Sequence, residues 1–267
     1  MILEVKNLNV NFKKRNDTLP IIKDVSFNLK ENTCLGILGE SGSGKSVTCK
    51  AIMGLLDKNF EVDGKIKFKK MDILGMKDRD KKNIRGKSIC MIMQNPMTAF
   101  NPLFTIEDQI IETFREHIDI SKEEAMKLSI ESLKKMNLNN GEEILSKYPH
   151  ELSGGMLQRI MIAITIGLEP DLIIADEPTT AIDCINQVEV IKEFKRMKEI
   201  LNTSMIFITH DLGVLAQVAD EVVVMHDGSI VERGSINKII NNPKENHTKY
   251  LIDTRLKLLR KFNEVIS

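Results

Sequence analysis

The residues with the clearest chemical meaning form a glycine-rich loop, Gly39-Glu40-Ser41-Gly42-Ser43-Gly44-Lys45-Ser46. The loop fits the pattern G-x-x-x-x-G-K-[ST] and follows the apolar, strand-like run Leu35–Leu38, where a phosphate-binding loop has to stand. Its glycines let successive backbone N–H groups approach phosphate oxygens, Lys45 adds a positive charge there, and Ser46 can ligate Mg²⁺. We therefore predict a nucleoside triphosphate site at the start of a helix whose N-terminal dipole faces the anion.

A second chemical feature is a pair of carboxylates at the end of an apolar strand. The run Leu172–Ala175 leads directly into Asp176 and Glu177. Beside a phosphate loop, the first carboxylate of such a pair can orient Mg²⁺ and the second can reach the attacking water. We assign Asp176 to the metal and Glu177 to the role of candidate general base.

A third feature is a second glycine-rich helix start, at Leu152-Ser153-Gly154-Gly155-Met156-Leu157-Gln158-Arg159. A helix N-terminus of this kind can bind an anion. Because one nucleotide occupies one phosphate loop, the second anion site suggests that the nucleotide site is completed by another copy or a partner. The same residues, taken alone, also fit a serine-capped helix after a glycine turn.

The strands that must position these groups fall into two classes. Continuous apolar runs, such as Leu172–Ala175 and Met205–Ile208, are typical of strands buried on both faces of a mainly parallel sheet. Alternating segments, such as Leu3–Lys6 and Val62–Phe68, indicate strands with one solvated face. The sequence therefore predicts an α/β protein with a mainly parallel core sheet and a small antiparallel β subdomain.

Between the two groups of strands, helical spacing predicts helices over Thr105–Ile118 and Lys122–Met136, and Ser121-Lys122-Glu123-Glu124 resembles a helix start. These helices indicate an inserted helical subdomain. We predict one domain over residues 1–267, divided into a nucleotide-binding core with the β subdomain (1–94 and 160–235), a helical subdomain (95–159) and a short C-terminal extension (236–267).

Composition limits the classes of partner. The 267 residues include 38 Lys plus Arg and 38 Asp plus Glu, so the formal net charge is zero and no global basic field attracts nucleic acid. The apolar runs are too short to span a bilayer and the N-terminus has no basic leader, so we expect the chain on the cytoplasmic side.

Cysteines and histidines give no metal-ligating pattern in the sequence. Four cysteines, Cys34, Cys49, Cys90 and Cys184, contain no C-x-x-C pair, and we interpret them as reduced and structural. Four histidines show no ligand spacing and are interpreted as surface or packing residues: His117, His150, His226 and His247.

Taken in order, the motifs resemble those of the ATP-binding cassette (ABC) transporter ATPases. The counterparts are Gly39–Ser46 for Walker A, Gln94 for the Q-loop, Leu152–Gln158 for the signature, Leu172–Glu177 for Walker B, Ala181–Asp183 for the D-loop and Thr209–Asp211 for the H-loop. The resemblance covers nearly the whole chain. It implies a P-loop NTPase fold and a head-to-tail dimer in which each ATP lies between one protomer's phosphate loop and the other's signature helix.

The same resemblance implies roles for single residues. Phe12 looks like the aromatic that stacks on adenine, with plain core packing as the alternative, and His210 looks like the switch histidine at the γ-phosphate. The implied catalytic residues are Glu177, His210, Lys45 and Gln94, and the implied Mg²⁺ ligands are Ser46, Gln94 and Asp176. The implied ATP-binding residues are Phe12, Gly39, Glu40, Ser41, Gly42, Ser43, Gly44, Lys45, Ser46 and Val47; those that serve ATP in trans are Ser153, Gly154, Gly155, Gln158 and Asp183.

Within the superfamily, four features look like the peptide and nickel importer branch: Met156 in place of the usual glutamine, Tyr148–Glu151, Asp176–Thr180, and the tail Asn242–Leu251. Ile92–Leu103 and Gly155–Arg159 look closer to the D-type ATPase of nickel importers. The resemblance thus favours nickel, or a related transition metal or metal chelate, over di- or oligopeptides as cargo.

The branch also implies partners. We expect two membrane permease subunits, which would contact the surface around Met97 to Thr105, unless that segment is only a loop. We further expect a second homologous ATPase, in a heterodimer with a homodimer as the alternative, and, indirectly, an extracytoplasmic substrate-binding protein. The chain would then lie peripherally on the cytoplasmic face of the membrane and bind no nucleic acid.

Rival classes fit less well. A non-transport ABC ATPase would have paired cassettes in one chain or a very long coiled coil, and this sequence has neither. A P-loop kinase would not need the signature helix, and a GTPase would need an N-K-x-D motif, which is absent from the sequence. A cassette that binds ATP without hydrolysis would not need Lys45, Asp176, Glu177 and His210 together.

Overall fold

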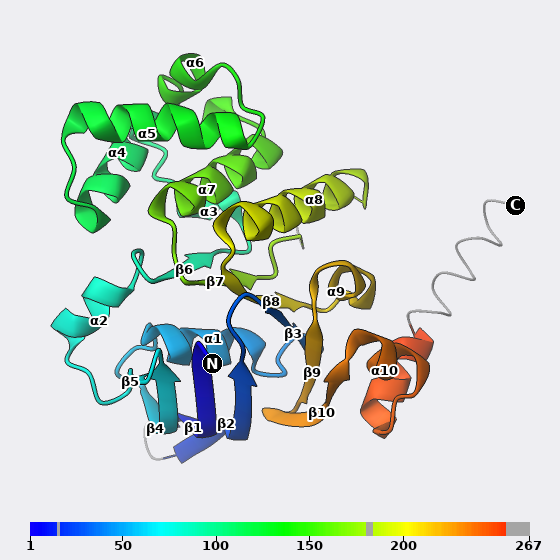
Figure 1. Cartoon of the computed structure of the whole chain (residues 1–267). Coiled ribbons are helices and arrows are strands. Elements are labelled where there is room, and N and C mark those ends of the chain that lie inside the picture. Colours follow the sequence, from blue (N-terminus) through cyan, green and yellow to red (C-terminus); the bar gives the residue numbers. More distant parts are fainter. Residues whose placement is uncertain (15–16, 180–183, 255–267) are drawn as a thin grey trace, which may run out of the picture.

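The computed structural model describes residues 1–14, 17–179 and 184–254. Its strands form two sheets, shown with the helices in Figure 1. The first is antiparallel, with the order β2 (Asp17–Leu29), β1 (Leu3–Lys14), β4 (Phe60–Phe68) and β5 (Met71–Asp72). The second has the order β10 (Ser229–Ser235), β9 (Glu221–His226), β3 (Cys34–Leu38), β8 (Ser204–Thr209), β7 (Leu172–Asp176) and β6 (Ile89–Ile92).

The second sheet is parallel from β9 to β6, and β10 is antiparallel to β9. Strands β3, β7 and β8 are buried at every position, as their continuous apolar runs predict. This arrangement confirms the predicted α/β fold with a mainly parallel core sheet and a small antiparallel sheet.

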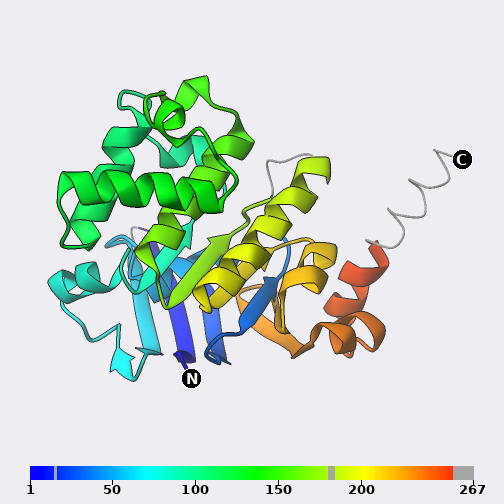
Figure 2. The ribbon, with the colours of Figure 1, turned by 45° about the horizontal axis from the view of Figure 1, so that its top comes forward.

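Helix α1 (Lys45–Met53) lies between the two sheets. Its Cys49, Ala51 and Ile52 share one apolar cluster with residues of the antiparallel sheet and of one face of the parallel sheet. The opposite face of the parallel sheet is covered by the helices of a second cluster. The order of layers is therefore antiparallel sheet, α1, parallel sheet and outer helices, which Figure 2 shows from a second direction.

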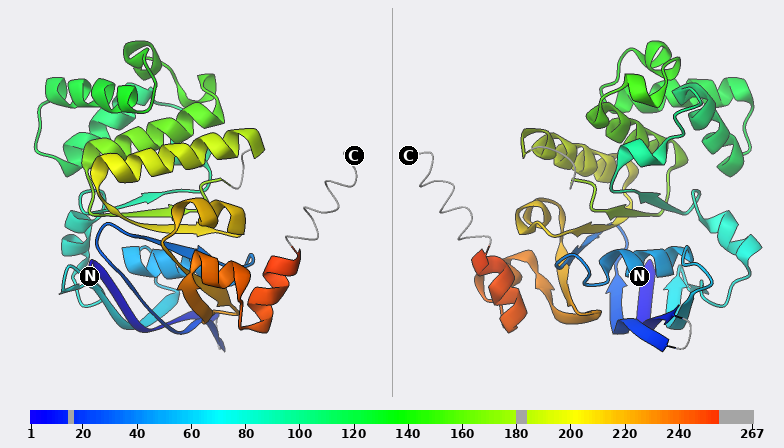
Figure 3. Two further views of the ribbon diagram at one scale, coloured as in Figure 1. Left: turned by 45° about the vertical axis from the view of Figure 1, so that its right-hand side comes forward. Right: turned by 180° about the vertical axis from the view of Figure 1, so that it is seen from behind.

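The remaining helices follow in chain order. They are α2 (Asp78–Ile84), α3 (Pro96–Ala99), α4 (Ile106–His117), α5 (Lys122–Lys135), α6 (Gly141–Leu145), a short 3₁₀ turn (Pro149–Glu151), α7 (Gly154–Leu168), α8 (Cys184–Leu201), α9 (Leu212–Val218) and α10 (Ile236–Asn241). Residues 246–254 are also helical and extend from the parallel-sheet side of the molecule, beside α10, as the two views of Figure 3 show.

Local sequence explains where the two predicted helices begin. The Thr105 hydroxyl accepts a hydrogen bond from the Asp108 N–H at the start of α4. Ser121 and Glu124 form a reciprocal capping box at the start of α5. Both helices match the predicted spans to within one residue at each end. Their starts are predictable because the capping residues lie within three residues of each other in the sequence.

Helix α7 crosses one of the predicted subdomain boundaries. The boundary at residues 159 and 160 falls inside α7, which runs unbroken from Gly154 to Leu168 because no glycine or proline stands at that point to end it. The division of the chain into core, helical subdomain and extension stays a prediction. No helix that the structure describes has both the length and the apolar character needed to cross a membrane.

Candidate functional site

The glycine-rich loop connects the end of β3 to the start of α1. Gly42 and Gly44 have φ values of 85° and 99°, in the left-handed region that glycine adopts without a Cβ penalty. The loop then leads into α1 at Lys45, so that the first N–H groups of the helix border the loop. The strand, loop and helix order predicted from the sequence is therefore present.

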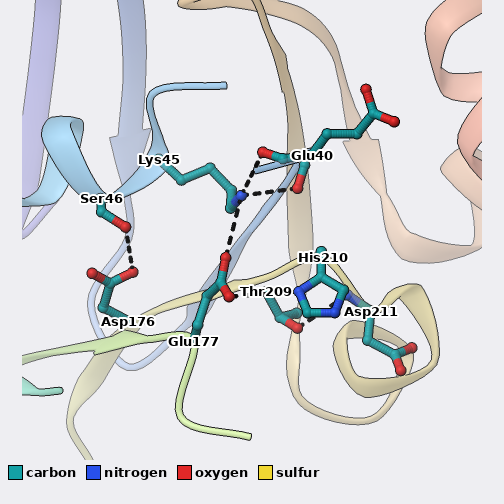
Figure 4. Close-up of polar contacts among 9 residues, drawn as sticks. Glu40, Lys45, Ser46, Asp176, Glu177, Thr209, His210 and Asp211 are labelled. Atoms are coloured by element: carbon teal, nitrogen blue, oxygen red, sulfur yellow. Dashed lines mark hydrogen bonds and ion pairs between the residues drawn. The ribbon is translucent and has the colours of Figure 1, made fainter. Parts of the chain in front are cut away.

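Lys45 lies inside this loop, with only 4% of its side chain exposed. Its Nζ donates hydrogen bonds to the carbonyl oxygens of Gly39 and Glu40, at 2.9 and 2.8 Å, and forms an ion pair with Oε1 of Glu177 at 3.4 Å (Figure 4). The ammonium group is thus fixed at the place where phosphate charge would accumulate.

Ser46 and Asp176 meet across the base of the site. The Ser46 hydroxyl donates a hydrogen bond of 2.9 Å to Oδ1 of Asp176 (Figure 4). Burial raises the pKa of Asp176, and this hydrogen bond offsets part of the shift. A hydroxyl and a desolvated carboxylate are hard oxygen donors of the kind Mg²⁺ prefers, so these two residues fit the predicted metal.

Glu177 follows the last residue of β7 and turns sharply into the site. Its φ is 47°, which is uncommon for a residue with a side chain, and its N–H donates to the Ile208 carbonyl at 3.0 Å. The Glu177 carboxylate lies between Lys45 and His210, whose Nδ1 is 3.5 Å from Oε2. Because β7 and β8 are parallel neighbours, the segments that follow them bring Glu177 and His210 together.

A cavity of about 710 Å³ opens in front of these groups. Its lining includes Gln94, Glu177 and His210, together with Gly39, Glu40 and Ser41 of the glycine-rich loop. Residues of the C-terminal helical segment, Tyr250, Leu251 and Thr254, complete one wall. The structure therefore brings the predicted Q-loop, Walker B and H-loop residues to one cavity.

Phe12 lies away from this cavity lining. Its ring packs against Phe60 with the ring centroids 5.0 Å apart, and it pairs with Leu19 and Phe60 across the antiparallel sheet. These contacts support the alternative that Phe12 is a packing residue, and its stacking on adenine stays a prediction.

The predicted signature begins α7. The Ser153 hydroxyl accepts a hydrogen bond from the Met156 N–H at 3.3 Å, and Ser153, Gly154 and Gly155 are exposed. None of the three lines the cavity formed by the chain's own phosphate loop. This placement leaves their N–H groups available to another molecule.

Gln158 is expected to contact the partner's ATP, but its side chain points into the protein core. Its side chain is fully buried, and neither amide atom has a hydrogen-bond partner among the described residues. It belongs to the inner side of α7, where Leu157 and Ile160 are also buried, so it cannot present its amide to a partner's ATP in this conformation. The in-trans role of Gln158 stays a prediction, and the burial of its side chain argues against it. Asp183, the remaining member of the set, lies outside the described residues.

The cysteines for which the structure gives side chains, Cys34, Cys49 and Cys90, are buried and unpaired. Burial raises the pKa of Cys34 and of Cys90 to about 12, so both thiols stay protonated at neutral pH. This agrees with their interpretation as reduced core residues.

Two of the histidines lie together in the fold. His226 and His247, together with Glu40, form a cluster whose potential ligand atoms all lie within 4.8 Å of one another. The sequence spacing gave no sign of this cluster, and the stacking of the two rings agrees with their interpretation as packing residues. No spacing signal could have found the cluster, because its members lie far apart in the sequence and meet only in the fold.

Comparisons with known proteins agree with this geometry. The family model described as "ABC transporter" matches residues 22–180. The chain is 42% identical to the "Metal-staphylopine import system ATP-binding protein CntD" of Staphylococcus aureus (strain Mu50), over 99% of this chain and 97% of that protein. It is 44% identical to the "Dipeptide transport ATP-binding protein DppD" of Lactococcus lactis subsp. cremoris, over 95% of this chain and 73% of that protein.

A solved structure has the same fold. It is the dimeric, post-hydrolysis state of the ATP-binding cassette MJ0796 bound to ADP and Pi, with a TM-score of 0.77 and 25% identity, over 88% of this chain and 99% of that one. These matches confirm the resemblance to ABC ATP-binding subunits of the peptide and nickel importer branch. The chain belongs to the ABC transporter family, as one of its ATPases.

Proposed function

We propose that this chain hydrolyses Mg·ATP to drive the import of a transition metal ion or metal chelate, with nickel as the first candidate cargo. The observation that supports the ATPase part is the contact of Glu177 with both Lys45 and His210 at a cavity that Glu177, His210 and the glycine-rich loop line. Asp176, which precedes Glu177, accepts the Ser46 hydrogen bond beside them. Lys45 begins α1, Asp176 and Glu177 stand at the end of β7, and His210 follows β8. Each has the chemistry that one part of phosphoryl transfer to water requires.

In this proposal the loop and Lys45 hold the β- and γ-phosphates. Mg²⁺, when bound through Ser46 and Asp176, would neutralise charge on the phosphate oxygens. Glu177 accepts a hydrogen bond from the attacking water and draws its proton, while His210 contacts the γ-phosphate from the other side. Gln94, at the cavity mouth, senses the metal and the water.

The site is completed in trans by a second ATPase subunit. Ser153, Gly154 and Gly155 are exposed at the start of α7 and lie outside the chain's own nucleotide cavity, so they are free to meet the partner's γ-phosphate. We assign Asp183 to the same interface. Because only the triphosphate contacts both subunits, ATP favours the closed dimer and hydrolysis releases it.

An exposed apolar surface next to Gln94 supports contact with permease subunits. Met93 is 47% exposed, Met97 48%, Leu103 78% and Phe104 52%, and all four lie within twelve residues of sequence around α3. Large apolar side chains gathered in this way mark an interaction surface. With two permeases bound there, the chain lies peripherally at the cytoplasmic face of the membrane, and an extracytoplasmic binding protein delivers the cargo.

The choice of cargo is supported by relatives and by motifs. The metal-staphylopine relative matches over nearly the whole of both chains, and Ile92–Leu103 and Gly155–Arg159 are closest to the nickel-importer pattern. The dipeptide relative has a similar identity, so a di- or oligopeptide is the second candidate. No contact among the described residues distinguishes the two cargoes, so a transport experiment has to decide between them.

The test is uptake of radioactive nickel, and in parallel of a labelled dipeptide, by cells carrying the intact chain or Lys45→Ala. Lys50→Ala is the matched control, because Lys50 is an exposed lysine of the same helix. We expect Lys45→Ala, and not Lys50→Ala, to abolish nickel uptake and to spare peptide uptake. Loss of peptide uptake alone would assign the chain to peptide import, and unchanged uptake of both would contradict the proposed function.

A further inference from the structure

A cluster of three potential metal ligands lies beside the nucleotide site, on the side away from Ser46 and Asp176. Glu40 comes from the glycine-rich loop, His226 ends β9, and His247 belongs to the helical segment 246–254. Their ligand atoms, one from each residue, all lie within 4.8 Å of one another. Ions bound by protein nitrogen and oxygen at about 2.0–2.2 Å hold their donor atoms about 3.4 Å apart in a tetrahedral site, so the three side chains would have to close around a bound ion.

The two imidazole rings are stacked, with centroids 3.7 Å apart and planes inclined by 25°, so binding of one ion by both rings requires one ring to turn out of the stack. The Nε2 atom of His247 is buried and has no hydrogen-bond partner among the described residues. Leaving a buried polar atom without a partner is unfavourable. A metal ion on the cluster would supply the missing partner.

The protonation state of His247 suits this role. Burial, and then the nearby His226, lower the pKa of His247, which favours the neutral imidazole at physiological pH. Only neutral imidazole has a lone pair for a metal. Asp227 adds a carboxylate at the edge of the cluster, with its Oδ2 atom 3.5 Å from Nε2 of His226, and such contacts orient ligating histidines.

Glu40 can serve this cluster without disturbing the phosphate loop. Lys45 is held by the backbone carbonyl of Glu40, whereas the Glu40 carboxylate points away from Lys45 and Glu177 (Figure 4). The carboxylate is exposed and forms no ion pair with any residue that the structure describes. The backbone and the side chain of this residue therefore face two different sites.

We propose that Glu40, His226 and His247 bind a divalent transition metal ion of the class that prefers imidazole, such as Zn²⁺, Ni²⁺ or Co²⁺. Two imidazoles and one carboxylate select these ions over Mg²⁺ and Ca²⁺, which prefer oxygen ligands alone. The site is distinct from the Mg²⁺ ligands at Ser46 and Asp176, and it does not depend on which cargo the transporter carries.

Metal binding here ties the C-terminal helical segment to the phosphate loop. His247 packs against Tyr250, with ring centroids 6.3 Å apart, and Tyr250 and Leu251 line the nucleotide cavity. A metal that cross-links His247 to Glu40 therefore fixes one wall of that cavity. The proposal thus adds a regulatory metal to a protein whose proposed catalytic metal is Mg²⁺.

The test is a titration of the purified, untagged full chain with Co²⁺, without nucleotide and with an excess of Mg²⁺, followed by the visible absorption of bound Co²⁺. We expect one Co²⁺ per chain, displaced by Zn²⁺. His226→Ala, His247→Ala and Glu40→Gln should each weaken binding by at least about tenfold. His150→Ala is the matched control, an exposed histidine outside the cluster, and should bind as the intact chain does.

Two further variants keep the result interpretable. Asp176→Asn removes a predicted Mg²⁺ ligand, so Co²⁺ binding that survives this change cannot be at the nucleotide site. His247→Gln, which keeps the size of the side chain and should fold if the alanine variant does not, must also lose binding. Absence of bound Co²⁺ in the intact chain, or binding that is unchanged by the histidine substitutions, would overturn the proposal while leaving the ATPase assignment intact.

Discussion

The Nζ atom of Lys45 lies 3.4 Å from Oε1 of Glu177, so the group that would hold the γ-phosphate is paired with the carboxylate that would polarise water. Both side chains are largely buried, at 4% and 16% exposure, and the pair is therefore screened less by salt than a surface pair would be. If ATP binds Lys45 as we propose, it competes with this carboxylate, so nucleotide binding should weaken the hold of Lys45 on Glu177.

The pair predicts the effect of Glu177→Gln on nucleotide affinity. The substitution removes a negative charge beside the phosphate site and frees Lys45, so ATP should bind as tightly as before or severalfold more tightly. Equilibrium binding of a fluorescent ATP analogue measures this, with Glu199→Gln, an exposed residue of α8, as the control. A marked loss of affinity in Glu177→Gln alone would contradict the pairing.

Asp176→Asn should stabilise the folded chain and abolish most of its Mg²⁺-dependent ATP hydrolysis. Burial raises the pKa of Asp176, so its charge costs free energy at neutral pH, and an amide can still accept the Ser46 hydrogen bond. Without Mg²⁺ or nucleotide we expect the variant to be more stable than the intact chain, with little Mg²⁺-dependent hydrolysis.

The sign of the pH dependence follows from the raised pKa. As the pH falls below that pKa, the carboxyl of the intact chain is protonated and its cost disappears, so the stability difference should shrink in acid. Denaturation midpoints of both proteins across the acidic range measure it. A difference that grows as the pH falls would show that Asp176 has the opposite shift.

Ser153→Arg should act on the partner's nucleotide and not on the chain's own. Ser153 is exposed at the start of α7, outside the cavity lined by Glu40 and Glu177. We expect unchanged ATP binding to the isolated chain and loss of hydrolysis in the assembled transporter. Ser121→Arg is a matched control, because Ser121 also caps an exposed helix start. Weakened nucleotide binding by a proven monomer of Ser153→Arg would refute the in-trans assignment.

Leu103→Glu should uncouple the ATPase from transport. Leu103 is 78% exposed in the apolar surface beside Gln94, so a charge there should not unfold the chain but should oppose docking of a permease. We expect uptake to fall by about tenfold or more while ATP binding of the isolated chain is unchanged. Met71→Glu, an exposed apolar position on the edge strand β5, is the control. Equal uptake by Leu103→Glu and the intact chain would place the permease contact elsewhere.

Features encoded by neighbouring residues were predictable from the sequence. The glycine-rich loop, the starts of α4 and α5 and the buried strands β7 and β8 all match, because caps, glycines and apolar runs act over a few residues. The acidic pair at Asp176 and Glu177 was likewise found from its place at a strand end.

Features that depend on packing between distant segments were not predictable in this way. The burial of Gln158 depends on which side of α7 faces the core, and the signature motif gives no information about that rotation. The contact between Phe12 and Phe60 depends on strand register, and the cluster of Glu40, His226 and His247 depends on three segments that meet only in the folded chain.

The most direct test of the account is steady-state ATP hydrolysis by Glu177→Gln in the assembled transporter. Glu177 has a left-handed backbone and lies in contact with His210 and Lys45, and we propose that the attacking water binds beside its carboxylate. If it is the general base, turnover should fall by roughly a hundredfold or more while ATP stays bound. Hydrolysis at the rate of the intact transporter would contradict the assignment of this carboxylate, and with it the proposed mechanism.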